Sequence, residues 1–211
     1  MATPAIYLNN NYTLLLATVV LSWTHGVDTQ HATHHTRSYT MAILDYVINL
    51  DPWWDDEYLH LDYEEEAFNN PLDTERWLKM GYRCNFVGAM CDMRKLQPTW
   101  NYKFIDYFTG LGWKDVGTSY YRMATGTILP THQDTYKRYV ELFNLEGQEH
   151  TIRRAIVFLE DWASGHYLEL KGQPVTGWKK GFTPVWAYDA PHMAANIGAT
   201  PRYTLQITGH V

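Results

Sequence analysis

Residues 120–134 read YYRMATGTILPTHQD, and their side chains alternate as those of an extended strand do before the segment ends in a histidine and an aspartate. Tyr121, Met123 and Thr125 fall on one face of such a strand and the intervening residues on the other. The rest of the C-terminal half has the same texture of short apolar runs. Further strands are expected over residues 154–159, 166–170, 184–188 and 203–208.

Turn residues separate these runs, and several short strands joined by such turns are typical of an antiparallel sandwich or barrel. The turn residues are Gly165, Gly172, Gly177, Gly181, Gly198 and Pro201.

The first half of the chain, residues 1–117, mixes helical and irregular patterns. We expect one domain over residues 1–211, with the first half supporting a β-core over 118–211. Helical periodicity is expected over residues 39–50 and 99–108, and a helix start at 71–75 with Asp73 or Thr74 as its cap. The acidic segment 51–66 is expected to be a surface loop, and we consider it as a lid selecting a positively charged substrate.

Composition excludes several classes of protein. The net charge is −6 and the 211 residues contain no long basic run, which disfavours nucleic-acid binding. The two cysteines, Cys84 and Cys91, are too few for a disulfide framework and lack the spacing of a zinc knuckle. The apolar stretch 13–21 is shorter than the roughly 20 residues that span a bilayer, and the first basic residue is Arg37. A cytoplasmic protein without a membrane segment is therefore expected; the oligomeric state stays open.

His132 and Asp134 form an HxD motif whose two side chains point to the same side of an extended chain. His192 follows an apolar strand sixty residues later, and a closed sheet can bring it beside His132. Two histidines and one carboxylate form the facial triad of non-haem iron(II) oxygenases, which leaves coordination positions open. Each element alone has an ordinary explanation, because a single histidine on an apolar strand is more often a hydrogen-bonded core residue.

Arg202 and Thr204 lie two residues apart on the last expected strand and face the same way. A guanidinium fork beside a hydroxyl suits a carboxylate. Taken alone, Arg202 would be a surface residue or an ion-pair partner, but it follows the HxD motif and His192 in chain order.

This order of HxD motif, distal histidine and arginine ten residues later resembles the iron(II)- and 2-oxoglutarate-dependent oxygenases. GTILPTHQD, residues 126–134, is similar to the prolyl hydroxylase branch. Residues 182–208 resemble the aspartyl/asparaginyl β-hydroxylases, which often lack the carboxylate that Asp134 provides here. Prolyl hydroxylases usually carry a tyrosine where this chain has Met123. Tyr121, on the same strand face, is expected to replace it, which puts a proline substrate in doubt.

The resemblance covers residues 118–208 and implies a mainly β fold with flanking helices. The fold would be a double-stranded β-helix, a cupin-like jelly roll, with N-terminal helices packed on the larger sheet. It implies Fe(II) on His132, Asp134 and His192, with 2-oxoglutarate and O2 as cosubstrates and Arg202 with Thr204 holding the far carboxylate. The implied activity is hydroxylation of a C–H bond in a peptidyl residue or a small amino-acid-like molecule, with succinate and CO2 as coproducts.

Three further residues are substrate-binding candidates, namely Tyr136, Arg154 and Trp162. Packing explains Tyr136 equally well, and an ion pair with Glu160 or Asp161 is the simpler role for Arg154. Two other functions stay open: a metal-dependent cupin that does not use 2-oxoglutarate, and a non-catalytic jelly-roll binding module. Succinate release separates the oxygenase from both.

Overall fold

Two antiparallel β-sheets form the fold in the computed structural model, which describes residues 46–83, 86–91, 93 and 96–211. The described residues belong to a unit that runs from Thr40 to Val211. No helix among them is long and apolar enough to span a bilayer.

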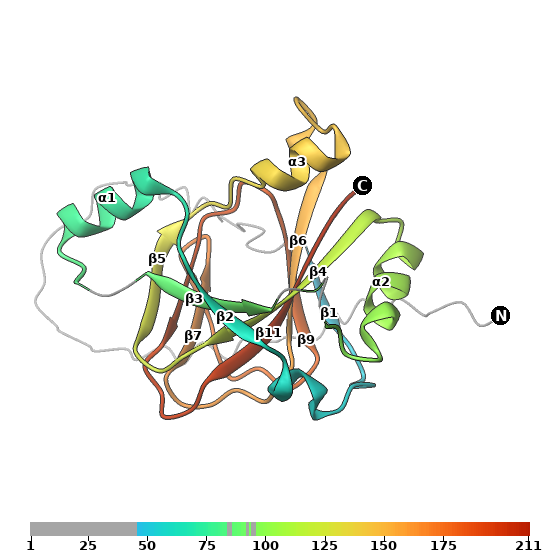
Figure 1. Ribbon diagram of the computed structural model, residues 1–211, viewed down its shortest axis with the longest axis horizontal. Helices are drawn as coiled ribbons and strands as arrows, with labels where there is room; N and C mark the ends of the chain where they lie inside the picture. Colours follow the sequence, from blue (N-terminus) through green and yellow to red (C-terminus); the bar gives the residue numbers. More distant parts are fainter. Residues whose placement is uncertain (1–45, 84–85, 92, 94–95) are drawn as a thin grey trace, which may run out of the picture. The chain divides into compact units, whose positions relative to one another are not determined.

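The larger sheet has seven strands, and every neighbouring pair in it is antiparallel (Figure 1). Its two central strands bury side chains on both faces, so both faces of the sheet are covered. In spatial order the strands are β1 (Tyr46–Asn49), β9 (Phe182–Ala187), β6 (Ile152–Phe158), β11 (Arg202–His210), β4 (Lys114–Met123), β3 (Val87–Cys91) and β2 (Tyr63–Ala67).

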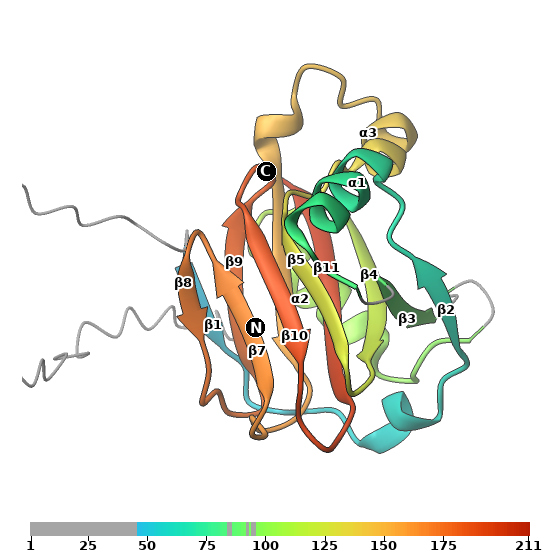
Figure 2. The same ribbon diagram turned by 90° about the vertical axis from the view of Figure 1, so that its left-hand side faces the viewer.

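The smaller sheet has four strands and faces the larger one across a shared core (Figure 2). In that core Ile156 and Phe158 of β6 belong to the same apolar cluster as Leu168 and Leu170 of the smaller sheet. Two such sheets packed face to face make a double-stranded β-helix, so the predicted fold class is confirmed. In spatial order the strands are β5 (Thr127–His132), β10 (His192–Asn196), β7 (His166–Leu170) and β8 (Gln173–Val175).

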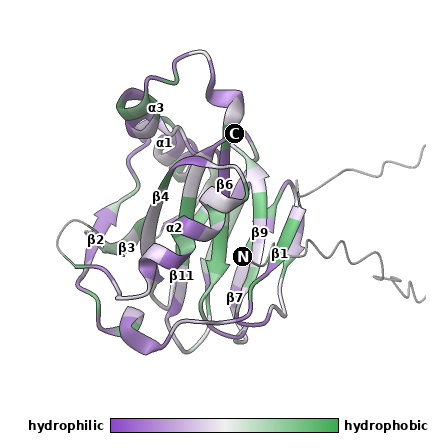
Figure 3. Ribbon diagram, turned by 90° about the vertical axis from the view of Figure 1, so that its right-hand side faces the viewer, coloured by the Kyte–Doolittle hydropathy of each residue, from purple (hydrophilic) through white to green (hydrophobic). Residues whose placement is uncertain are grey.

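A second core lies on the outer face of the larger sheet, under helix α2 (Asn101–Gly110) (Figure 3). Phe104 and Phe108 of α2 are fully buried there, together with Tyr120 and Val157 of the sheet. This helix is the one expected over residues 99–108, and it packs on the larger sheet as predicted.

Helix α1 (Pro71–Met80) lies elsewhere, beside the end of β5, and is therefore an exception to the expected packing. The indole Nε1 of Trp77 donates to the carbonyl of Thr131 at 3.3 Å, and its ring packs against that of His132. The cap of α1 is Asn70, not Asp73 or Thr74, because the Asn70 side chain accepts from the first free backbone amides of the helix.

The first half of the described chain contains more β-structure than its sequence indicates. Tyr46–Asn49 is a strand paired with β9 where the sequence predicted a helix; residues 39–45 of that prediction lie outside the described residues. The acidic segment is also not simply a loop: it holds a short 3-10 helix, η1 (Asp56–His60), and strand β2. The apolar stretch 13–21 and the residue Cys84 lie outside the described part of the chain.

Two short helical segments complete the described fold: α3 (Lys137–Phe143), which follows the HxD motif, and η2 (Glu149–Thr151), which leads into β6.

Candidate metal centre

His132 and His192 are direct neighbours across two antiparallel strands. His132 ends β5 and His192 begins β10, and the register pairs these two residues. Their ring centroids are 4.4 Å apart and both side chains are buried. Strand pairing thus brings together two residues that lie sixty positions apart in the sequence, as the closed-sheet prediction requires.

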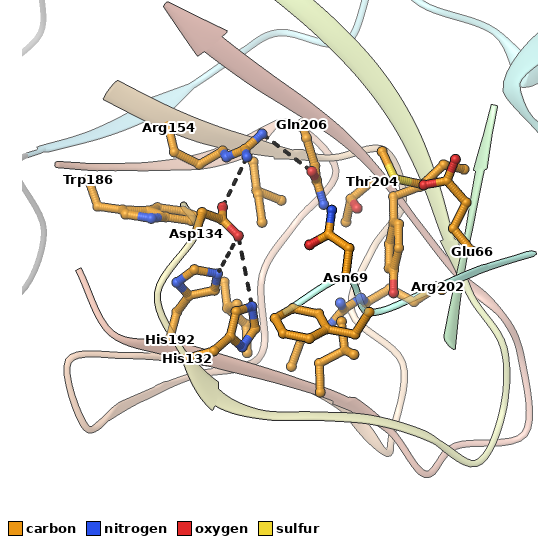
Figure 4. A pocket seen from close by; sticks show the side chains of 18 of the residues that line it. Glu66, Asn69, His132, Asp134, Arg154, Trp186, His192, Arg202, Thr204 and Gln206 are labelled. Carbon is orange, nitrogen blue, oxygen red and sulfur yellow. Dashed lines mark hydrogen bonds and ion pairs between the residues drawn. The ribbon is translucent and has the colours of Figure 1, made fainter. Parts of the chain in front are cut away.

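Asp134 completes a three-residue cluster just past the end of β5. Its Oδ1 atom lies 3.9 Å from Nε2 of His132 and 3.9 Å from Nε2 of His192. One ligand atom from each of the three residues falls within 4.8 Å of the others, so all three can converge on one ion (Figure 4). Among the described residues this is the one group of three or more histidine, cysteine, aspartate and glutamate side chains with that spacing.

Backbone carbonyls fix the orientation of both imidazoles. Nδ1 of His132 lies 2.7 Å from the carbonyl of Pro130, and Nδ1 of His192 lies 3.0 Å from the carbonyl of Ala190. Since a carbonyl only accepts, each Nδ1 carries the proton and each Nε2 presents its lone pair to the centre. A histidine that binds a metal needs this tautomer.

The charges of the cluster also suit a cation. Burial, with a contribution from His192, lowers the pKa of His132 from 6.5 to about 4, so this imidazole is neutral at pH 7. Burial raises the pKa of Asp134, but Arg154 and the two histidines outweigh it and lower that pKa to about 2. The neutral imidazole of His132 and the carboxylate of Asp134 are in the protonation states that a divalent metal requires of such ligands.

The depressed pKa of His132 predicts that the metal-free protein loses stability in mild acid. Between pH 6.5 and 4 the unfolded chain protonates this imidazole while the folded protein does not, so stability falls as pH falls. The difference between a pKa of 6.5 in the unfolded chain and about 4 in the folded protein corresponds to about 3 kcal/mol of stability. Urea unfolding of the metal-free protein across this range measures the effect, and His132→Asn should flatten the profile by a comparable amount. Equal pH slopes for both proteins would contradict a buried neutral His132.

Arg202, Thr204 and Tyr121 lie together on the inner face of the larger sheet. Thr204 of β11 pairs with Tyr121 of β4, and Arg202 is two residues from Thr204 on the same face. All three side chains are buried. The predicted common orientation of Arg202 and Thr204 agrees with the structure, and Tyr121 joins them from the neighbouring strand.

Arg202 is a buried cation with no acidic partner among the described residues. Its Nη1 donates to the carbonyl of Tyr167 at 2.7 Å, but in the described part of the chain neither its Nε nor the hydroxyl of Tyr121 has a hydrogen-bond partner. Burial lowers the pKa of Arg202 to about 10 and raises that of Tyr121 to about 12. A buried guanidinium without an anionic partner is energetically costly. The Arg202 guanidinium and the Tyr121 hydroxyl are therefore suited to bind an anion.

Gly88 on β3 explains how the Tyr121 ring fits against the neighbouring strand. A Cβ atom at this position would overlap the phenol oxygen and ring carbons of Tyr121. Only glycine leaves room for the ring, so β3 helps to place the Tyr121 hydroxyl.

One cavity of about 170 Å³ contains both groups of residues, far more space than the roughly 10–15 Å³ that a single water requires. The metal cluster and the arginine lie on its wall together with residues from both sheets and from the segment after β2 (Figure 4). Its apolar wall includes Leu129, Ile156, Leu168, Trp186 and Ala194.

The three substrate-binding candidates have different positions. Arg154 lines the cavity, but it pairs with Asp134 at 2.9 Å and not with Glu160 or Asp161. Tyr136 is buried behind Arg154 and does not line the cavity. Trp162 lies on a separate apolar hollow of the smaller sheet and donates to the carbonyl of His166.

Sequence reasoning missed several cavity residues. Gln206 lies on the same strand face as Arg202 and Thr204. The alternation of side chains along the strand could therefore have predicted that it lines the cavity. Glu66, Phe68 and Asn69 also line the cavity, and the Phe68 ring lies 4.8 Å from that of His132. No local pattern marks this segment, because it reaches the cavity only through the pairing of β2 with β3.

Comparisons with known proteins give limited similarity. No protein-family model and no curated protein sequence matches this chain. A prolyl-4-hydroxylase from Pseudomonas putida is 14% identical over 73% of this chain and 95% of its own, with a TM-score of 0.45. A cupin protein from Bacteroides fragilis is 12% identical over 47% of this chain and 70% of its own, with a TM-score of 0.33. TM-scores this low carry no argument about function, which rests on the side chains of the cavity.

Proposed function

We propose that this protein is an Fe(II)- and 2-oxoglutarate-dependent oxygenase that hydroxylates a C–H bond of a peptidyl residue or a small amino-acid-like molecule. The observation that carries the proposal is one cavity that combines a His-Asp-His cluster with a buried arginine that has no acidic partner in the described ranges. The cluster suits iron(II) because three protein ligands leave positions open for a chelating cosubstrate and O2. The arginine suits the second carboxylate of a dicarboxylic acid.

The residues of this chain have distinct tasks in the proposed reaction. His132, Asp134 and His192 would hold the iron, and Arg202 with Thr204 and the Tyr121 hydroxyl would bind the far carboxylate of 2-oxoglutarate. The apolar wall around Leu129 would limit the access of water. When bound, iron and 2-oxoglutarate supply the oxidising chemistry, in which O2 gives one oxygen atom to the substrate and one to succinate, with release of CO2.

The polar side of the cavity suits the prime substrate. Glu66, Asn69 and Gln206 line it, and Glu66 has no ion-pair partner among the described residues. Of the acidic segment 51–66, which we considered as a lid, the C-terminal end at Glu66 lines the cavity. Earlier in the segment, Trp54 belongs to the outer core and Asp55 accepts a hydrogen bond from Trp100. Any selection for a positively charged group would therefore fall to Glu66 and not to Asp55, Asp56 or Glu57.

Anaerobic titration of the metal-free protein with iron(II) and then 2-oxoglutarate tests the proposal. We expect a weak visible metal-to-ligand charge-transfer band, which requires iron and the 2-oxo acid bound together. Succinate is the matched control, because it keeps both carboxylates but lacks the keto group and should give no band. Admission of O2 should then release succinate from 2-oxoglutarate. Iron binding without a band would favour a metal-dependent cupin, and no iron binding would favour a non-catalytic module.

A further inference from the structure

Arg154 makes three side-chain hydrogen bonds around the metal cluster. It lies on β6 with its side chain on the inner face, like Ile156, and is 14% exposed. Its Nη2 donates to Oδ2 of Asp134 at 2.9 Å, its Nε to the hydroxyl of Tyr136 at 3.2 Å, and its Nη1 to Oε1 of Gln206 at 3.3 Å. The guanidinium also lies over the Tyr136 ring, 4.9 Å from its centroid.

These contacts give the two carboxylate oxygens of Asp134 different environments. Oδ2 accepts from Arg154, whereas Oδ1 lies 3.9 Å from each histidine Nε2 (Figure 4). A carboxylate free to rotate offers a metal either one oxygen or both. Arg154 engages Oδ2, so Oδ1 alone faces the histidines.

We propose that Arg154 is a positioning residue that holds Asp134 as a one-oxygen metal ligand and, through Gln206, ties the metal centre to the polar side of the cavity. The inference rests on the proposed metal site. One-oxygen ligation keeps a coordination position free that a chelating carboxylate would occupy, which the proposed cosubstrate and O2 require. Tyr136, considered above as a substrate contact, instead supports Arg154.

The planar fork explains why an arginine occupies this position. Its N–H groups reach Asp134, Tyr136 and Gln206 at once, whereas a lysine ammonium is a compact charge on a flexible stem. Arg154→Lys therefore keeps the charge next to Asp134 but loses the fixed geometry. Any change in metal binding then reports orientation and not the removal of a positive charge.

Cobalt(II) binding to the metal-free variants tests the inference. We expect Arg154→Lys to bind Co(II) about 10- to 100-fold more weakly, the usual effect of removing a partner of a metal ligand. The visible Co(II) spectrum should also change, because a released Asp134 alters the coordination geometry. Tyr136→Phe removes one support of Arg154 and should shift affinity and spectrum in the same direction by less.

Arg153→Lys is the matched control. Arg153 directly precedes Arg154 on β6, so its side chain points to the opposite face of the sheet. It donates to the carbonyls of His150 and Ile152. The Arg153→Lys variant should therefore keep the wild-type affinity for Co(II) and the wild-type Co(II) spectrum. Wild-type Co(II) binding by a folded Arg154→Lys protein would overturn the inference; if that variant does not fold, wild-type binding by Tyr136→Phe would do so. Failure of the wild-type protein to bind Co(II) would instead overturn the metal site and the proposed function.

Discussion

Replacement of His132 by alanine is expected to remove most of the metal affinity. Free energies of roughly 10–16 kcal/mol for four-ligand zinc sites correspond to about 2.5–4 kcal/mol per ligand, or on the order of 100- to 1,000-fold in affinity. His192→Ala should have an effect of the same size, because the two imidazoles are equivalent in tautomer and in distance to Asp134. Competition titration with a chromophoric chelator measures the dissociation constants.

His210→Ala is the matched control for both variants. Like His132, His210 lies beside an aspartate, with Nε2 2.8 Å from Oδ2 of Asp115, but it lines no part of the cavity. The metal affinity of the His210→Ala variant should equal that of the wild-type protein. Wild-type affinity in His132→Ala would mean that the ion binds elsewhere, and the proposed centre would then be wrong.

Local patterns made the C-terminal strands predictable. The strand at 166–170 has the predicted bounds, and α2 differs from its predicted bounds by two residues at each end. Both carry a clear period of buried residues, and short-range sequence records that period well. Differences of one or two residues at the ends of elements are ordinary.

The strands missed by the sequence analysis depend on tertiary context. In β10, residues His192–Asn196, no side chain is β-branched or aromatic apart from the histidine, yet the segment forms a strand because β5 and β7 pair with it on both sides. In β2, residues 63–67, three consecutive glutamates indicate a loop, and pairing with β3 makes it a strand.

The same distinction applies to the site. His132, Asp134, His192 and Arg202 could be found from chain order and strand alternation. The partner of Arg154 could not, because the candidate carboxylates were those nearby in sequence, whereas Asp134 is twenty residues away and meets Arg154 only after the sheets pack. The position of Trp162 on a separate hollow could not be read from the sequence, because it lies four residues beyond the end of β6, where alternation no longer indicates the side a residue faces.

Replacement of Arg202 by methionine is expected to separate cosubstrate binding from metal binding. Loss of one partner from a buried ion pair costs about 3–5 kcal/mol, so the affinity for 2-oxoglutarate should fall roughly 100- to 4,000-fold. Iron or cobalt affinity should not change, because within the described chain Arg202 forms no hydrogen bond or ion pair with the three metal-site residues and donates instead to the carbonyl of Tyr167. Titration of the charge-transfer band measures the affinity for 2-oxoglutarate, and competition with a chelator measures the metal affinity.

The stability of the ligand-free Arg202→Met protein distinguishes a binding role from a structural one. Among the described residues the guanidinium has no counter-ion, and its one hydrogen bond there, to the carbonyl of Tyr167, is worth about 1 kcal/mol. Methionine fills similar space without the desolvation cost, so the free energy of unfolding should stay within about 1–2 kcal/mol of the wild-type value or rise. Arg122→Met on β4 is the control, because the Arg122 side chain lies over the Tyr63 ring, outside the cavity, and should leave 2-oxoglutarate affinity unchanged. A large loss of stability in Arg202→Met, with cosubstrate affinity preserved, would show that Arg202 supports the fold and would remove the main argument for 2-oxoglutarate.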